Sequence, residues 1–147
     1  MLVLLVSLFL SFSKEARAAD IILHDLNAKA VNISSYIGKP TILLFWTTWC
    51  PYCRKEIKAL NQIYPQIKKE GINIFAINIG ESDYTVKKFF ISNALGFSVL
   101  LDKDAVAADK YGVVGVPTYV FMDKFGHVNS DLHALPSNYK KLLLGEK

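Results

Sequence analysis

Apolar positions change their spacing along the chain, and each change predicts an element. A run of apolar and β-branched residues starts at Thr41 and stops before Cys50, which is typical of a strand covered on both faces. After Cys53 the apolar positions fall at helical spacing, and residues 72–79 form a second continuous run. A strand, a helix and a strand of this length form a βαβ unit, so we expect two parallel strands joined by a right-handed crossover.

The helix of this unit contains one residue that should disturb it. Pro65 lies inside the helical pattern and predicts a kink or an early end, and Gly71 marks the last position that the helix can reach. We expect its charged side chains mostly to face solvent; they are Arg54, Lys55, Glu56, Lys58, Lys68 and Lys69.

The remaining segments complete an α/β pattern. Weak alternation over residues 20–35 predicts a short β-hairpin before the central strand. A helix capped by Ser82 or Asp83 should follow the second strand, with Val86 and two phenylalanines facing inward. Further elements are predicted in this order: a strand at 97–101, a helix at 105–111, a strand at 119–122, a hairpin turn at 123–126 and a helix at 138–144.

The first residues indicate export. An apolar run over residues 2–12 is followed by small residues that include Ala16 and Ala18, which predicts a signal peptide over residues 1–18 and a domain over 19–147. The run is short for a membrane span, which needs about 20 residues. Because no Lys or Arg precedes it, an uncleaved anchor stays open as an alternative. Whether the segment is a cleaved signal peptide or an uncleaved anchor, the domain is expected in an oxidising space, the periplasm or the exported side of a bacterial membrane.

Composition narrows the class of protein. The chain has 147 residues, 52% of them hydrophobic and 20% charged, which fits one globular domain and argues against disorder. The net charge is +4 and the lysines are scattered, so we expect no nucleic-acid partner. No surface stripe demands a second subunit, and we expect a monomer.

The two cysteines of the chain, Cys50 and Cys53, lie two residues apart at the predicted start of the first helix. The first amides of a helix lack partners and the helix dipole is positive there, so a thiolate at Cys50 would be stabilised. Cys53, one turn inside, should be shielded and placed to attack a mixed disulfide on Cys50. Pro51 suits the first turn. These residues predict a thiol–disulfide redox site that needs no cofactor.

Two simpler explanations of the cysteine pair are weaker. Half of a zinc site would need further ligands, but no other cysteine exists and the histidines, His24, His127 and His133, lack paired ligand spacing. A structural disulfide across so short a loop would constrain the unfolded chain little. We therefore expect no metal.

Pro117 comes directly before a predicted strand, where its missing N–H removes a ladder donor. A trans proline at the start of a strand and a cis peptide bond both fit this position.

Three motifs together resemble one family: Phe45-Trp46-x-x-Trp49-Cys50-x-x-Cys53, Gly80-Glu81-Ser82 and Gly115-Val116-Pro117-Thr118. Their order and spacing, from about residue 25 to 128, are similar to the thioredoxin superfamily and, within it, to exported TlpA/ResA/CcmG-like thiol–disulfide oxidoreductases. The resemblance implies a thioredoxin-like α/β fold: a central mixed sheet flanked by helices, with an N-terminal β-hairpin and a helical insertion after the second core strand.

The resemblance also implies roles for residues. Cys50 would be the nucleophile and Cys53 the resolving thiol, and a cis bond between Val116 and Pro117 would face the dithiol and offer backbone groups to an extended substrate. The other expected substrate contacts are Trp49, Pro51 and Tyr52.

Glu81 matches an acidic residue that this branch keeps near the dithiol. Our hypothesis is that it assists proton transfer to or from Cys53. The alternative is a surface carboxylate at the start of a helix.

The chain departs from the family pattern in three places. Leu44 stands where thioredoxin has a buried acid, which favours a role for Glu81. Lys58 replaces a proline that many relatives have in the first helix, so that helix should be straighter at its start. The dipeptide between the cysteines, Pro51-Tyr52, also occurs in glutaredoxins and tunes the reduction potential.

The function that fits best is reduction of client disulfides in the exported space. Apocytochrome c before haem attachment is one such client, and a membrane thiol carrier would supply the electrons. One alternative is a DsbA-like oxidant, although only about thirty residues separate the second strand from Pro117, too few for the helical insertion of that group. Another alternative is a thiol-tethered chaperone or metallochaperone, although copper carriers of this fold have three residues between the cysteines and this chain has two. We do not expect a peroxidase, because its cysteine lies in a different loop pattern.

Overall fold

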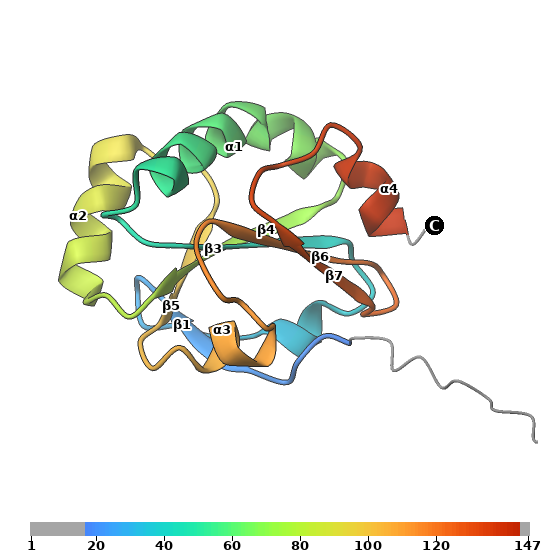
Figure 1. Ribbon diagram of the computed structural model, residues 1–147, viewed down its shortest axis with the longest axis horizontal. Helices are drawn as coiled ribbons and strands as arrows, with labels where there is room; N and C mark the ends of the chain where they lie inside the picture. Colours follow the sequence, from blue (N-terminus) through green and yellow to red (C-terminus); the bar gives the residue numbers. More distant parts are fainter. Residues whose placement is uncertain (1–16, 145–147) are drawn as a thin grey trace, which may run out of the picture.

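One mixed β-sheet runs through the molecule (Figure 1), and the computed structural model describes it within residues 17–144. Its strands are β1 (Ile22–Asp25), β2 (Ala30–Asn32), β3 (Thr41–Trp46), β4 (Asn73–Ile79), β5 (Ser98–Asp102), β6 (Thr118–Met122) and β7 (Val128–Leu132). The helices are α1 (Pro51–Lys69), α2 (Asp83–Asn93), α3 (Val106–Lys110) and α4 (Tyr139–Leu144), with a 3-10 helix η1 (Ile33–Tyr36).

The strand order is β2-β1-β5-β4-β3-β6-β7, which puts the strand before the cysteines at the centre. β3 pairs in parallel with β4 and antiparallel with β6, and all six of its residues are buried. The predicted βαβ unit, the N-terminal hairpin and the mixed sheet are therefore confirmed.

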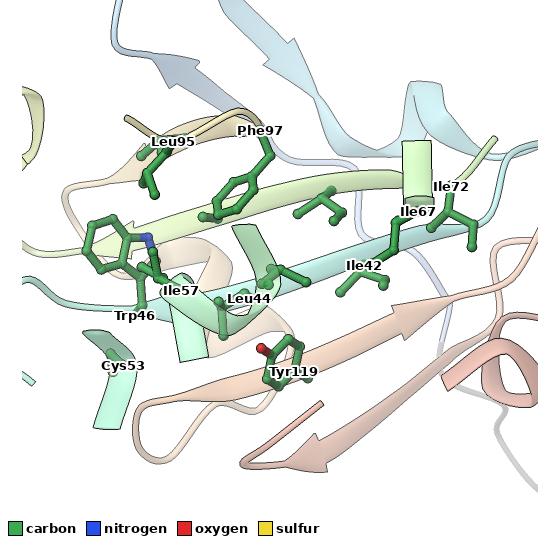
Figure 2. Close-up of a cluster of buried hydrophobic side chains, with 14 of the residues drawn as sticks. Ile42, Leu44, Trp46, Cys53, Ile57, Ile67, Ile72, Leu95, Phe97 and Tyr119 are labelled. Atoms are coloured by element: carbon green, nitrogen blue, oxygen red, sulfur yellow. The ribbon is translucent and has the colours of Figure 1, made fainter. Parts of the chain in front are cut away.

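Alternate residues of β3 enter two apolar layers. Ile42, Leu44 and Trp46 point to the side of α1, α2 and α4, where the larger cluster of buried residues lies. Leu43 and Phe45 point to the opposite side, covered by α3 and η1. Figure 2 shows the first layer, with Cys53 at the end where Trp46 lies. The dithiol thus forms one end of a close-packed core.

The early end predicted at Pro65 is wrong, because α1 continues to Lys69. Packing on both sides of the proline explains the difference. The Tyr64 ring meets Phe97 at a centroid distance of 5.7 Å, and Ile67 is fully buried. These contacts outweigh the one helical hydrogen bond that a proline removes.

The leader predicted for residues 1–18 lies outside the described residues except for its last two. Arg17 forms an isolated bridge with His127, and the Ala18 amide donates to the Gly126 carbonyl at 2.7 Å. Within residues 17–144, none of the helices combines the length and the hydropathy that a membrane span requires.

Candidate active site

Cys50 is the N-cap residue of α1, so its sulfur lies at the positive end of the helix. The Cys53 amide donates to Cys50 Sγ at 3.2 Å, and the Cys50 thiol lies 3.8 Å from the Val116 carbonyl oxygen. Pro51 occupies the first turn, as predicted. An amide donor and the helix dipole both favour negative charge on this sulfur, which is what a nucleophilic thiolate needs.

Cys53 has a different environment. Its side chain is fully buried, whereas Cys50 keeps 5% of its surface exposed. Burial, helped by a hydrogen bond with Cys50, raises the pKa of Cys53 to about 12, and a backbone hydrogen bond from Thr47 opposes that rise. Cys53 therefore stays protonated at neutral pH and has to lose a proton before it attacks.

Apolar side chains surround the dithiol on its solvent side. Trp49 and Tyr52 are 69% and 75% exposed, and Pro51 is exposed between them. The peptide bond between Val116 and Pro117 is cis, as the resemblance implied, and it brings the Val116 carbonyl to Cys50. These predicted substrate contacts lie around one sulfur, and their role in binding stays a prediction.

One exposed apolar residue, close in the sequence to the cis proline, was not predicted. Val114 is 95% exposed, two residues before the Val116 carbonyl that meets Cys50. An apolar side chain between Gly112 and Gly115, just before the proline, was the available signal.

Glu81 lies behind the loop that leads to Cys50. Its Oε2 accepts hydrogen bonds from the Thr48 amide and from Asn78 Nδ2, both at 2.7 Å, and its Oε1 accepts from Thr48 Oγ1 at 2.5 Å. The side chain is half-buried, and the cap of α2 is Ser82 instead. Glu81 is thus an anchor of the active-site loop rather than a surface carboxylate, and its part in proton transfer stays a hypothesis.

The charged side chains of α1 were expected mostly to face solvent, and Glu56 is the exception among the six that were named. The side chain is half-buried, and its Oε2 accepts from the Tyr119 hydroxyl at 3.0 Å and from the Leu135 amide at 3.2 Å. Glu56 follows Cys53 by three residues, a spacing that places both on one face of α1. That spacing was the signal for a carboxylate on the dithiol side of the helix.

Tyr119 lies between this carboxylate and Cys53, since its hydroxyl donates a hydrogen bond to Glu56 and the charge of Cys53 acts on it. Burial, then the charge of Glu56 and the hydrogen bond to it, and finally the charge of Cys53 raise the pKa of Tyr119 far above its usual range. Tyr119 is also the β6 partner of Leu44, the position that lacks the buried acid. A carboxylate therefore reaches the same region from α1 instead of from β3.

Metal ligands are not gathered in the part of the chain that the structure describes, where no group of three or more His, Cys, Asp or Glu could hold an ion. His127 contacts Asp123, and His133 Nδ1 lies 2.8 Å from the Pro117 carbonyl oxygen. His133 thus supports the loop of the cis proline.

Comparisons with known proteins agree with this geometry. The model of the AhpC/TSA family matches residues 15–130. The thiol–disulfide oxidoreductase ResA of Bacillus cereus is 35% identical over an alignment of 127 residues, which covers 82% of this chain and 73% of the relative.

Two solved structures are similar in fold and sequence. The thiol:disulfide interchange protein DsbE of Chlorobium tepidum has a TM-score of 0.77 and 28% identity, with 90% of this chain and 94% of the other covered. A secreted disulfide oxidoreductase of Mycobacterium tuberculosis, homologous to DsbE, has a TM-score of 0.71 and 26% identity over 82% of this chain and 90% of the other. The chain belongs to the AhpC/TSA family of thioredoxin-like proteins and is a thiol–disulfide oxidoreductase of the ResA/DsbE type.

Proposed function

We propose that the protein reduces disulfides of client proteins in the exported space, with apocytochrome c before haem attachment as a client. The observation that carries this direction is the short segment between β4 and β6. It holds α2, β5 and α3, which leaves no room for the helical insertion of DsbA-like oxidants. Burial keeps Cys53 protonated at neutral pH, where its raised pKa leaves the balance between dithiol and disulfide almost unchanged. The direction is therefore supported by the fold and its similarity to the ResA/DsbE type, and the Cys50–Cys53 dithiol would donate electrons.

The reaction requires two exchanges. The Cys50 thiolate attacks one sulfur of the client disulfide, which forms a mixed disulfide and releases the first client thiolate. Cys53 then loses its proton and attacks Cys50 Sγ, which releases the second client thiolate and leaves the protein oxidised. Two electrons pass to the client, and two protons end on its thiols. A membrane thiol carrier would return the dithiol to its reduced form.

An extended client segment fits the surface around Cys50. The Val116 carbonyl lies beside the reacting sulfur. Exposed apolar side chains flank both groups in the sequence: Trp49 and Tyr52 beside Cys50, and Val114 two residues before Val116. Such a surface favours an unfolded client whose backbone and apolar side chains are accessible.

Export is supported by the signal-peptide pattern of residues 1–18 and by the secreted relative from Mycobacterium tuberculosis. In that compartment most protein cysteines are oxidised to disulfides. A reductant therefore works against the redox potential of its surroundings and needs a supply of electrons.

The direction is tested by the reduction potential of the Cys50–Cys53 pair, measured by equilibration with glutathione or dithiothreitol. We expect a value near or below about −250 mV, in the range of thioredoxin. A value near about −120 mV, that of a strong oxidant, would contradict the proposal.

The client is tested by trapping. A Cys53→Ala variant leaves Cys50 able to form the mixed disulfide but unable to resolve it, so clients should remain attached to it. A Cys50→Ala/Cys53→Ala variant is the control for non-covalent capture. Recovery of c-type apocytochromes would support apocytochrome c as the client. If only other proteins were trapped, apocytochrome c would be ruled out and those proteins would be the clients.

A further inference from the structure

A groove between α1 and α2 begins beside the dithiol. Its volume is about 600 Å³. Pro51, Arg54, Lys55 and Lys58 line it from α1, and Phe89 and Asn93 line it from α2. Figure 1 shows the first turns of α1 next to α2. Because Pro51 directly follows Cys50, the groove opens where a client would be attacked.

Packing fixes the shape of this groove. Phe89 is half-buried and contacts Trp46 of the core at a ring-centroid distance of 5.0 Å. Beyond the groove, α1 is joined to the segment after α2 through Asn61. Its Oδ1 accepts from the Gly96 amide at 2.8 Å, and its Nδ2 donates to the Ala94 carbonyl at 3.4 Å. The groove therefore extends from the dithiol toward the contact of Asn61 with Ala94 and Gly96, where the two segments are joined.

The charge of the groove is positive and uncompensated. Arg54, Lys55 and Lys58 are exposed, and none of them forms an ion pair with a side chain that the structure describes. The two helices carry one carboxylate each, and both are used elsewhere. Glu56 accepts from Tyr119, and Asp83 pairs with Lys103 at 3.6 Å. A ligand of this groove would thus meet three cations and an aromatic floor.

We propose that this groove binds an acidic segment of the client, next to the cysteine that Cys50 attacks; the inference rests on the function proposed above. An α-helix rises 1.5 Å per residue, so Arg54 and Lys58 lie about 6 and 12 Å along α1 from Cys50. An extended chain advances about 3.3 Å per residue. The complementary Asp or Glu should therefore stand about two to four residues from the client cysteine, on one side of it only.

The same cations could act in a simpler way, by stabilising the Cys50 thiolate through their field. That effect would speed the reaction with every disulfide alike, whatever its neighbouring residues. A preference for acidic clients that depends on their sequence separates the groove from a general effect of charge.

The test uses the reduced protein and synthetic peptides with one cysteine, activated as the mixed disulfide with thionitrobenzoate. The peptides carry two residues of Glu, Gln or Lys at two to four positions before the cysteine, or at the same distance after it. We expect the Glu peptide of one side to react about tenfold faster than its Gln counterpart at low ionic strength. The difference should fall below about twofold near 0.5 M salt, because exposed charges are then screened.

Two variants of equal charge locate the effect. Arg54→Gln/Lys58→Gln should remove the preference for the Glu peptide. Lys68→Gln/Lys69→Gln, which removes the same charge from the far end of α1, should retain it. The ratio of the Glu and Gln rates is the readout, since it is independent of changes in the reactivity of Cys50 itself.

Three outcomes would contradict the proposal that this groove binds an acidic segment. They are equal rates for the Glu and Gln peptides, an equal preference for Glu on both sides of the cysteine, and a loss of preference in the Lys68/Lys69 variant as large as in the Arg54/Lys58 variant. Failure of the wild-type protein to react with any peptide would instead overturn the proposed reductase function, and the role of the groove with it.

Discussion

Burial of one thiol of the dithiol makes the stability of the reduced protein depend on pH. The pKa of Cys53 rises from 9.0 to about 12 on folding, so its contribution to stability is complete below about pH 9 and is lost as pH rises toward 12. Relative to a Cys53→Ala variant, the free energy of unfolding should fall by about 2–3 kcal/mol between pH 8 and pH 11. Urea unfolding of both reduced proteins measures this difference. A constant difference across that range would show that Cys53 titrates normally.

Glu81 offers the second prediction for a single residue. If it takes part in proton transfer, Glu81→Gln should slow the attack of Cys53 on a preformed mixed disulfide by about 100-fold and alter its pH profile. Asp83→Asn, a change of an exposed carboxylate two residues later, is the matched control. A slower reaction with an unaltered pH profile would mean that Glu81 only positions the loop through Thr48.

The sequence predicted the residues of the site unequally. Cys50 and Cys53 were identified because their chemistry depends on local spacing at the start of a helix. Glu56 was missed because its charge suggested a position facing solvent, whereas its place three residues after Cys53 puts it on the same face of α1 as Cys53. The bonds of Glu81 to Thr48 join residues 33 positions apart, so they follow only from the packing of β3 against β4.

Among the elements, continuous apolar runs made the central strands predictable, whereas short or interrupted elements were less so. η1 was assigned to the end of a hairpin, but Asn32 caps it by accepting from the Ser34 amide. The pairing of β1 with β5 also needed the structure, since it joins distant segments. The length of α1 depended on contacts of Tyr64 and Ile67 that a proline rule does not include.

The short helix α3 provides a stability prediction for an element. Its N-cap residue, Ala105, has no side-chain acceptor, and Asp102 at the end of β5 accepts from the Ala107 and Ala108 amides at 3.1 and 2.9 Å. Asp102 is 2% exposed, so Asp102→Ala should lower the free energy of unfolding by about 2 kcal/mol because both amides lose their acceptor.

Asp102→Asn keeps one acceptor and should cost less. Asp104→Ala, at an exposed position of the same turn, is the control, and thermal or urea unfolding measures all three variants. Equal stability of the Asp102→Ala and Asp104→Ala proteins would show that α3 does not depend on this cap.

At the scale of the whole molecule, strand direction assembles the site from three distant segments. β3 and β4 are parallel, so the Thr47–Cys50 loop and Glu81 meet at their carboxyl ends. β6 is antiparallel to β3, which brings the cis proline at its start to the same edge. The βαβ pattern predicted the first meeting, and only the family resemblance predicted the second.

The core also gives the molecule an optical property. Trp46 and Trp49 are the only tryptophans of the chain. Trp46 lies in the same buried cluster as Cys53, and Trp49 precedes Cys50 at the surface. All tryptophan emission therefore originates next to the dithiol. Oxidation of the cysteines should change the surroundings of both fluorophores, so we expect that the redox state of the unlabelled protein can be followed by its own fluorescence.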